Sequence, residues 1–303
     1  MRQLCRPEAG PVDYAGGNGG AAPAVRRFVI VTTTVTASRA GRSVGELLRE
    51  WRDRRRISQL DLAISAEIST RHLSFVETGR SKPSRDMVLR LGEHLEVPLR
   101  ERNQLLLAAG YAPAYAESGL GAPEMAAVSK AVRQLLTSHE PYPAAVADRW
   151  WNLVDANASV SIMTDLVSPT LMTPPVNVLR LTLHPEGMAP HVLNLGEWRA
   201  HLLGRLRRQV TQTADPVLTD LLEELLTYPC ADPVPEVEVP GPGDIFVPLR
   251  LRHEGADLTF FSTVSTFGTP LDITVAELVI ESFFPADADT AEHLRAYAAR
   301  GME

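Results

Sequence analysis

Apolar residues recur with helical spacing from residue 43 onward. The first run keeps the i, i+3, i+4, i+7 rule at Val44, Leu47, Leu48 and Trp51. Ser43 precedes it, and Glu46 follows three residues later, which is the pattern of a capping box. Further short runs begin after Ser58, Ser69, Ser84 and Pro98, and glycines at 79 and 110 follow two of them. The pattern predicts five short helices between residues 43 and 110, with no strand among them.

Two of these predicted helices lie close together in "SQLDLAISAEISTRHLSFVE", residues 58–77. The first has an apolar stripe predicted at Leu60, Ala63 and Ile64, and the second begins another at Leu73 and Val76. Two helices joined by a short turn inside a small bundle form a helix-turn-helix, whose second helix enters the DNA major groove. Residues of the second helix that avoid its core are expected to project outward: Thr70, Arg71, His72, Ser74 and Phe75.

These residue types suit contacts with DNA. Arg71 has the donors that bind guanine O6 and N7. Phe75 is compatible either with contact to a thymine methyl group or with packing. Gln59 opens the first helix of the pair, where side chain and backbone N–H groups bind a phosphate. Ser69 at the start of the second helix, with Arg80 and Lys82 just after it, completes the predicted DNA-binding set.

A different pattern follows residue 111. "APAYAESGLGAP", residues 112–123, has the composition of a linker, and a helix with Val128, Val132, Leu135 and Leu136 on one face comes next. "PAAVADRWWNLVDANAS" predicts two strands with a turn at residues 148–150, and residues 157–230 read as mainly helical. "IFVPLRLRHE", "DLTFFSTVSTFG" and "TVAELVIESFFP" predict an antiparallel meander before a last helix. The expected fold is α+β around one five-stranded antiparallel sheet.

Composition and charge divide the chain in the same way. The 303 residues suit two domains, with a Gly/Ala/Pro-rich, disordered leader expected at 1–40. We expect a helical DNA-binding domain at 41–111, the linker at 112–123 and a second domain at 124–303. The net charge is +3 for residues 1–40, +3 for 41–115 and −13 for 116–303. Phosphate repels an acidic domain, so the helical domain must carry any DNA binding.

Other classes of protein have less support. There is no run of 18 apolar residues and no secretory signal pattern, which favours a cytoplasmic protein without a membrane span. Cys5 and Cys230 are far apart and predict neither a disulfide framework nor a zinc site. His184, His191 and His201 match no metal-ligand spacing, so no metal is expected. No H-E-x-x-H pair and no phosphate-binding loop occurs.

The segments "SQLDLA", "LSFVETGRSKPS" and "VLRLGEHLEVP" resemble the repressor-type helix-turn-helix of the XRE/lambda-repressor family over residues 43–110. The resemblance implies a phosphate contact for Gln59 and base contacts for Thr70, Arg71 and Ser74. It also implies an inward ion pair between an arginine of the first helix, Arg52, and a glutamate late in the third, Glu77. The family commonly has glycine in the turn where Glu67 stands, so a left-handed backbone is expected at a non-glycine residue.

The second half resembles the MmyB-like regulators over "YPAAVADRWWNLVDANAS" and "FFSTVSTFGTPLDITVAELVIESFFPAD". That family joins an XRE domain to a PAS-like ligand-binding domain, which implies transcription control by an effector such as a fatty acid or another apolar small molecule. Arg180 in an apolar run needs an anionic partner if it is buried, either a ligand carboxylate or an internal acid, and it lies alternatively at the surface. The tryptophans are alternatively core residues. The candidate ligand-binding residues are Trp151, Arg180, His184, Trp198 and Phe261.

Together these features predict a sequence-specific transcription regulator that binds double-stranded DNA as a homodimer, because one short recognition helix reads few bases. The linker and the helix after it are expected to carry the ligand signal. An enzyme that uses the helical domain as an adaptor is one alternative, and the missing catalytic constellation argues against it. A protein-binding, antitoxin-like module is another, and the size of the second domain argues against that.

Overall fold

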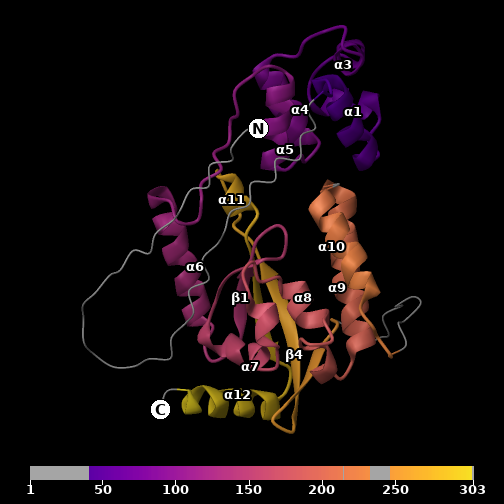
Figure 1. Cartoon of the computed structure of the whole chain (residues 1–303). Coiled ribbons are helices and arrows are strands. Elements are labelled where there is room, and N and C mark those ends of the chain that lie inside the picture. The colour runs from indigo at the N-terminus through magenta and orange to yellow at the C-terminus, as the bar shows by residue number, and fades with distance from the viewer. Residues whose placement is uncertain (1–40, 214, 233–245, 302–303) are drawn as a thin grey trace, which may run out of the picture.

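The computed structural model describes residues 41–213, 215–232 and 246–301. The leader expected at 1–40 lies outside these residues. A cluster of short helices occupies one end of the molecule, and a sheet with flanking helices forms the rest (Figure 1). No helix in the described ranges combines the length and apolarity needed to cross a bilayer.

The first cluster consists of the five predicted helices. They are α1 (Val44–Arg55), α2 (Gln59–Ser65), α3 (Thr70–Glu77), α4 (Arg85–His94) and α5 (Leu99–Ala108). The capping box of Ser43 and Glu46 is present, and the side chains of Ser58, Ser69 and Ser84 each accept from the backbone N–H three residues later. The core gathers Leu48, Trp51, Leu73, Leu91 and Leu105, among others.

Two details of this packing were not predicted. Of the expected stripe only Ala63 is buried, because Leu60 and Ile64 of α2 are 57% and 67% exposed, and Leu62 joins Ala63 on the buried face. Gly45 lies where α1 crosses the end of α3. A Cβ atom there would stand 2.3 Å from the carbonyl oxygen of Val76, so the crossing requires glycine.

The remaining chain alternates short helices with strands. Its α-helices are α6 (Ala126–Ser138), α7 (Ser161–Thr164), α8 (Val178–Leu183), α9 (Leu195–Thr213), α10 (Pro216–Thr227), α11 (Ile273–Ala276) and α12 (Ala288–Arg300). Its 3-10 helices are η1 (Pro123–Met125), η2 (Ala158–Val160), η3 (Pro169–Met172) and η4 (Ala189–His191). Its strands are β1 (Ala144–Ala147), β2 (Leu153–Ala156), β3 (Leu249–His253), β4 (Ala256–Ser265) and β5 (Val279–Pro285).

The five strands form one antiparallel sheet in the order β2-β1-β5-β4-β3, which confirms the predicted α+β fold. The last predicted strand began too early. Residues 273–276 form α11 instead, because the Asp272 side chain accepts from the backbone N–H groups of Thr274 and Val275 and starts a helical turn.

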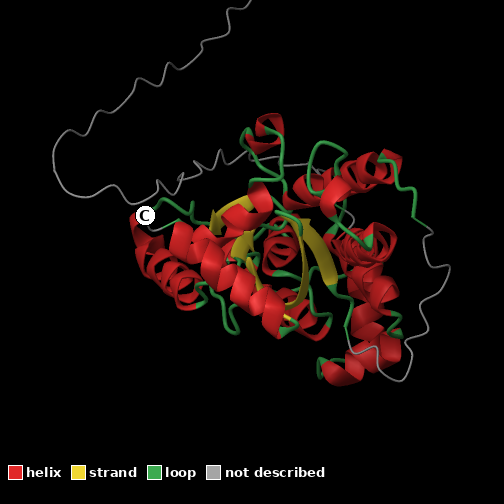
Figure 2. Cartoon of the chain, turned by 90° about the horizontal axis from the view of Figure 1, so that it is seen from below, coloured by secondary structure: helices red, strands yellow, loops and turns green. Residues whose placement is uncertain are grey.

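The sheet separates two apolar regions, because successive strand residues point to opposite faces. Ala144 and Val146 of β1, with Ile280 of β5, pack with Val132 and Leu136 of α6. Their strand neighbours, Ala145, Ala147, Val279 and Phe283, line a cavity on the other face. Viewed from below, helices surround the sheet on more than one side (Figure 2). Leu135 of α6 is 51% exposed, so this member of the predicted apolar face does not pack.

Candidate functional site

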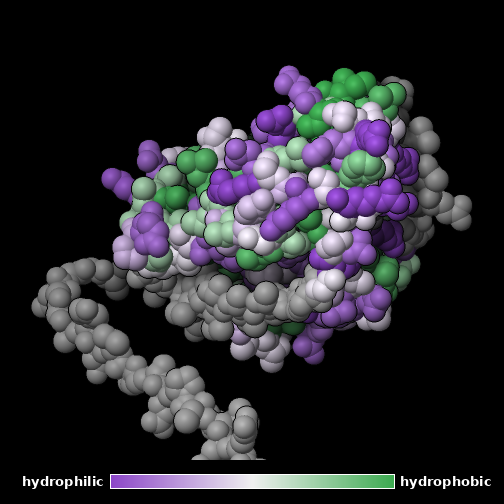
Figure 3. All heavy atoms as spheres, turned by 90° about the horizontal axis from the view of Figure 1, so that it is seen from above, coloured by the Kyte–Doolittle hydropathy of each residue, from purple (hydrophilic) through white to green (hydrophobic). Residues whose placement is uncertain are grey.

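Helix α3 presents polar side chains outward, while Leu73 and Val76 are buried. Arg71 is exposed, and Thr70 and Ser74 are half-buried. An α-helix with its side chains is about 10–12 Å across, which fits the major groove of about 12 Å width. Looking down on this end of the molecule, Figure 3 shows a face that is mostly hydrophilic with smaller hydrophobic areas between.

Phe75 lies between two arginines. The guanidinium of Arg71 is 5.3 Å from the centre of the ring, and that of Arg80 is 6.0 Å from it. Cations at this distance over an aromatic ring are attracted to it. The half-buried ring of Phe75 is therefore close to the guanidinium groups of two candidate DNA-contacting arginines.

Glu77 joins three helices through its carboxylate. Its oxygens accept from Nε of Arg52 on α1 at 2.7 Å and from Nε2 of Gln59 on α2 at 2.7 Å. The Glu77 side chain is only 2% exposed and that of Arg52 11%. The hydrogen bond to Glu77 raises the pKa of the Arg52 guanidinium above its usual value. The inward pair implied by the family resemblance is present, and Gln59 belongs to it, which fixes the first residue of α2.

The other predicted DNA-contacting residues surround α3. The Ser69 hydroxyl accepts from the backbone N–H of His72 and so caps the helix, and its own proton has no acceptor among the described residues. His72 is half-buried, and Lys82 is exposed with its Nζ atom 5.4 Å from the ring of Tyr111. Glu67, in the turn between α2 and α3, has φ 54°, the left-handed conformation expected there.

A cavity of about 510 Å³ lies between the sheet and helices α7, α8 and α9. This is within the size range of small-molecule sites. Its walls are mainly apolar and include Leu153, Met163, Leu179, Leu202 and Phe283. Its polar residues include Glu101, Asp148, Arg149, Arg208 and Glu277. The cavity therefore suits an apolar molecule with a polar group.

Two of the five candidate ligand residues, Trp151 and Trp198, line this cavity. Trp151 has φ 66°, which is rare for a bulky side chain and often marks a functional site. Its indole N–H donates to Oε1 of Gln209 at 2.8 Å, and the Arg205 guanidinium lies 4.8 Å from its ring centre. Helix α9 thus holds Trp151 in place.

Trp198 is 3% exposed, and its indole N–H has no hydrogen-bond partner within the described part of the chain. An unpaired buried donor costs about 1–3 kcal/mol, so such groups usually have a partner. The nitrogen itself is buried, so the side chain meets the cavity through its carbon atoms.

Arg180, His184 and Phe261 are not among the residues that line the cavity. Arg180 binds both carboxylate oxygens of Glu224 at 2.7 and 2.6 Å, the internal acid that was the alternative to a ligand. His184 accepts from the backbone N–H of Glu186 and packs against the ring of Tyr228. Phe261 follows the core residue Phe260, so its side chain points to the opposite face of the sheet. There it stacks on Phe284 of the neighbouring strand.

One side of the cavity reaches the first helical cluster through Pro98 and Glu101, which belong to the start of α5. Glu277 accepts from Nε of Arg100 on α5 at 2.9 Å and from Nη1 of Arg149 at 2.9 Å. Arg149 also donates to Asp215 and lies 3.9 Å from Glu101. Charged residues from α5, the β1–β2 turn, the end of α11 and the start of α10 therefore meet at or beside the cavity wall.

Burial alters the acidity of two carboxylates at this wall. Burial raises the pKa of Glu101, and the nearby Arg149 opposes the shift. Burial likewise raises the pKa of Asp148, opposed by hydrogen bonds from Asn152 and the backbone of Trp150. Both groups are therefore protonated at a higher pH than exposed carboxylates are.

The segment expected to be a linker also contacts both parts. The Asn103 side chain of α5 accepts from the backbone N–H groups of Ala114 and Tyr115. Farther along, the backbone N–H of Ser118 donates to the Asp272 side chain, which caps α11. The segment is therefore fixed at two points between α5 and α11.

Sequence reasoning missed Arg149, Gln209, Glu277 and Arg205. Arg149 lies in the β1–β2 turn, Arg205 and Gln209 lie on α9, and Glu277 directly follows α11, and none of them belongs to a local motif. The one sequence signal near them is "DRWWN", residues 148–152, where an arginine stands next to two tryptophans.

Comparison with protein families identifies the two parts of the chain. The model of the MmyB-like transcription regulator ligand-binding domain matches residues 128–296, more than half of the chain. The chain belongs to the MmyB-like transcription regulators. A helix-turn-helix domain model matches residues 43–105, which contain α1–α5 up to the middle of the last helix. The protein thus combines a DNA-binding domain with a ligand-binding domain. A comparison with curated proteins found no match.

Proposed function

We propose that this MmyB-like regulator reads a specific DNA sequence with α3 and changes its DNA affinity when an apolar small molecule fills the cavity. The observation that carries the proposal is the cavity wall itself, which α5 of the helix-turn-helix domain helps to form through Pro98 and Glu101. A ligand there would contact the DNA-binding domain directly. We further propose domain limits of 41–111 and 124–303, joined by residues 112–123.

In the DNA complex, Arg71, Thr70 and Ser74 are proposed to contact bases. Arg71 makes no ion pair or hydrogen bond within the described residues, so its donors are free for guanine O6 and N7. Arg80 and Lys82, both exposed after α3, would bind phosphate, as would the N-terminus of α2 at Gln59. Phe75 supports the arginines, and Ser69 and His72 flank them.

The ligand is proposed to be an apolar chain or ring system with at least one acceptor oxygen, such as a fatty acid. The apolar walls favour the hydrocarbon part. Arg149 and Arg208 at the cavity wall supply hydrogen-bond donors that favour the oxygen. Arg208, which lines the cavity, could neutralise a carboxylate.

Signal transfer is proposed to pass through Glu277. Its carboxylate bridges Arg100 of α5 and Arg149 beside the cavity. A ligand that displaced Arg149 would remove its contacts with Glu277 and with Glu101 of α5, and so weaken the attachment of α5 to the cavity wall. A ligand shifts such an equilibrium only through unequal affinity for the two arrangements. Helix α6, first expected to carry the signal, packs on the face of the sheet opposite the cavity.

The regulator is proposed to bind as a homodimer. Two recognition helices about 34 Å apart would enter successive major grooves of one operator. A small rotation of α1–α5 against the ligand-binding domain would change that spacing and abolish cooperative contact.

One short sequence pattern matches a motif of hydrolytic enzymes, but its structural context does not support an enzymatic function. Residues 41–45, "GRSVG", have the letters of a G-x-S-x-G motif. That motif requires a strand before the serine and an exposed hydroxyl at a sharp turn. Here the Ser43 hydroxyl caps α1 and accepts from the backbone N–H of Glu46.

The test compares purified full-length protein before and after delipidation, on DNA from the region upstream of its own gene, across a salt titration. Native mass spectrometry identifies what co-purifies. We expect a co-purified apolar molecule, a DNA affinity that changes when it is removed, and recovery when it is added back. Leu202→Trp, which fills the cavity, should abolish the ligand response while leaving a measurable DNA affinity. If delipidation and Leu202→Trp both leave the affinity unchanged, the sensing proposal fails and DNA binding alone remains.

A further inference from the structure

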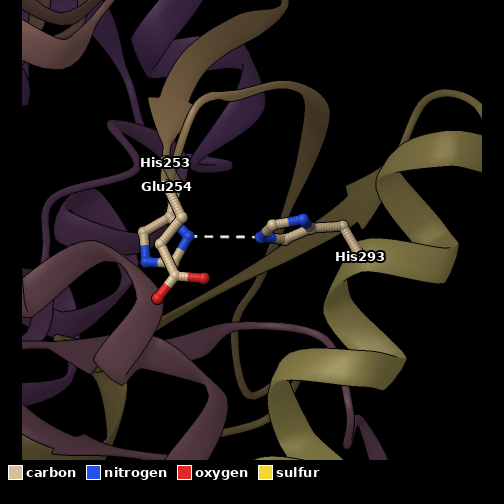
Figure 4. A group of neighbouring side chains, drawn as sticks. All are labelled: His253, Glu254 and His293. Carbon is tan, nitrogen blue, oxygen red and sulfur yellow. Dashed lines mark hydrogen bonds between the residues drawn. The ribbon is translucent and has the colours of Figure 1, made fainter.

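Two imidazole rings and a carboxylate meet where α12 crosses the turn between β3 and β4. Figure 4 shows the side chains of His253, Glu254 and His293, with Nδ1 of His253 3.2 Å from Nε2 of His293. One potential ligand atom from each residue lies within 4.8 Å of the other two. None of the three is among the residues that line the cavity, and none belongs to α1–α5.

We propose that His253, Glu254 and His293 form a binding site for one divalent transition-metal ion, with Zn²⁺ as the best-fitting ion. Nothing in the DNA-binding or ligand-sensing role requires this site. It rests on the placement of these three side chains.

The spacing of the two rings fits a shared ion. Zinc binds imidazole nitrogen at about 2.0–2.1 Å with tetrahedral geometry, which puts two such nitrogens about 3.3 Å apart. The observed separation is 3.2 Å. A tetrahedral ion lies to one side of the line that joins the two nitrogens, so both rings would tilt to point their lone pairs at it while the nitrogens keep nearly the same separation.

Glu254 is held beside this pair by the turn. Its φ is 48° and that of Gly255 is 82°, while His253 and Ala256 on either side are paired, so a two-residue turn joins β3 to β4. Such turns favour Asn-Gly or Asp-Gly. Glutamate in the left-handed position is less favourable, and it places a longer carboxylate next to the imidazoles.

The donor set selects the class of ion. Two imidazoles with one carboxylate suit Zn²⁺, Ni²⁺ or Cu²⁺, whereas Mg²⁺ and Ca²⁺ prefer oxygen ligands alone. Three protein ligands leave the fourth position for water.

Arg300 would compete with a metal ion for the carboxylate of Glu254. Its Nη2 atom lies 2.8 Å from Oε2 of Glu254, with both side chains more than half exposed. A metal ion would replace Arg300 as the partner of the carboxylate. Because exposed ion pairs contribute little, this exchange costs little.

The ion would fasten α12 to the β3–β4 hairpin. His253 ends β3, whereas His293 belongs to α12, whose Leu294 packs into the main core of the ligand-binding domain. In Figure 1, α12 lies at the end of the molecule away from α1–α5. The expected effect is therefore on the stability of the ligand-binding domain, with no direct contact to DNA.

The test uses the full chain without a histidine tag, stripped with chelator and titrated with ZnCl₂ by calorimetry. Co²⁺ is added in parallel to read the coordination geometry from its visible spectrum. We expect one ion per chain and a Tm that rises on adding Zn²⁺. His293→Ala should weaken binding at least about 100-fold, since even indirect partners of metal ligands contribute 10–100-fold. His293→Ala carries this test because His253 is only 4% exposed, and replacing it can disturb folding.

Two controls separate this site from other histidines and from a simple hydrogen bond. His191→Ala, in η4, should keep full binding. Arg300→Ala should keep or tighten binding, because it releases Glu254, whereas Glu254→Gln should weaken it. The proposal is overturned if fewer than one ion binds per chain, or if His293→Ala binds Zn²⁺ as tightly as the unmodified protein does. Loss of binding in Arg300→Ala would also overturn it.

Discussion

The guanidinium of Arg100, on the last helix of the helix-turn-helix domain, binds both carboxylate oxygens of Glu277 at 2.9 and 3.0 Å. Glu277 also binds Arg149 and lines the cavity. One carboxylate therefore connects the DNA-binding domain to the site where a ligand is proposed to bind.

Replacing Glu277 tests this connection. Glu277→Gln removes the charge that holds Arg100 and Arg149 together, so we expect DNA binding that no longer depends on delipidation. The measurement is DNA affinity of the variant with and without the co-purified molecule. Glu117→Gln is the matched control, because Glu117 also binds Arg100 but is 43% exposed and does not line the cavity. A ligand response of normal size in Glu277→Gln would place the coupling elsewhere.

The buried position of Glu101 predicts a pH dependence. Its folded-state pKa is raised, chiefly by burial, so the folded protein binds a proton more tightly than the unfolded chain does. Stability from this group is therefore present below the unfolded pKa and is lost as the pH rises through the folded value. Glu101→Gln should remove that decline. Thermal unfolding of both proteins from pH 4 to pH 8 measures it. Parallel curves for the two proteins would show that Glu101 does not titrate in this range.

Arg71 and Arg80 should behave differently in DNA binding. Arg71→Ala should cost about 1–3 kcal/mol on the specific operator and relax the preference at one base position. Arg80→Ala or Lys82→Ala should weaken binding to all sequences alike and reduce the salt slope, because a phosphate contact releases counterions. Binding assays on operator and random DNA at several salt concentrations compare them. Equal loss on both DNAs for Arg71→Ala would remove it from the base-reading set.

Glu77 should be essential to the first domain. Glu77→Ala leaves the Arg52 guanidinium buried without its partner, which costs about 3–5 kcal/mol. The helix-turn-helix domain should then melt before the ligand-binding domain, as two transitions in calorimetry. Asp53→Ala is the control, because Asp53 also pairs with Arg52 but is 57% exposed, and exposed pairs contribute at most about 1 kcal/mol. A single unchanged transition in Glu77→Ala would contradict the expected role.

The sequence by itself determined the parts of this protein that depend on neighbouring residues. Capping serines, apolar periodicity and closing glycines specified α1–α5, because capping and helical spacing act within one or two turns. The family resemblance added the Arg52–Glu77 pair and the left-handed Glu67. Alternating apolar residues likewise predicted the five strands, although β3 begins only at Leu249 and the start of the last predicted strand is α11, where a capping aspartate outweighed β-branched composition.

Only the tertiary structure decided which residues share a site. Arg180 looked like a ligand contact because its neighbours in sequence are apolar, yet Glu224, 44 residues away, is its partner. Phe261 follows the core residue Phe260 and still lies on the opposite face, because strand residues alternate. The Glu277 bridge and the His253–His293 pair join residues 177 and 40 positions apart. Contacts of this kind depend on how helices and strands pack, and local sequence has no pattern that encodes them.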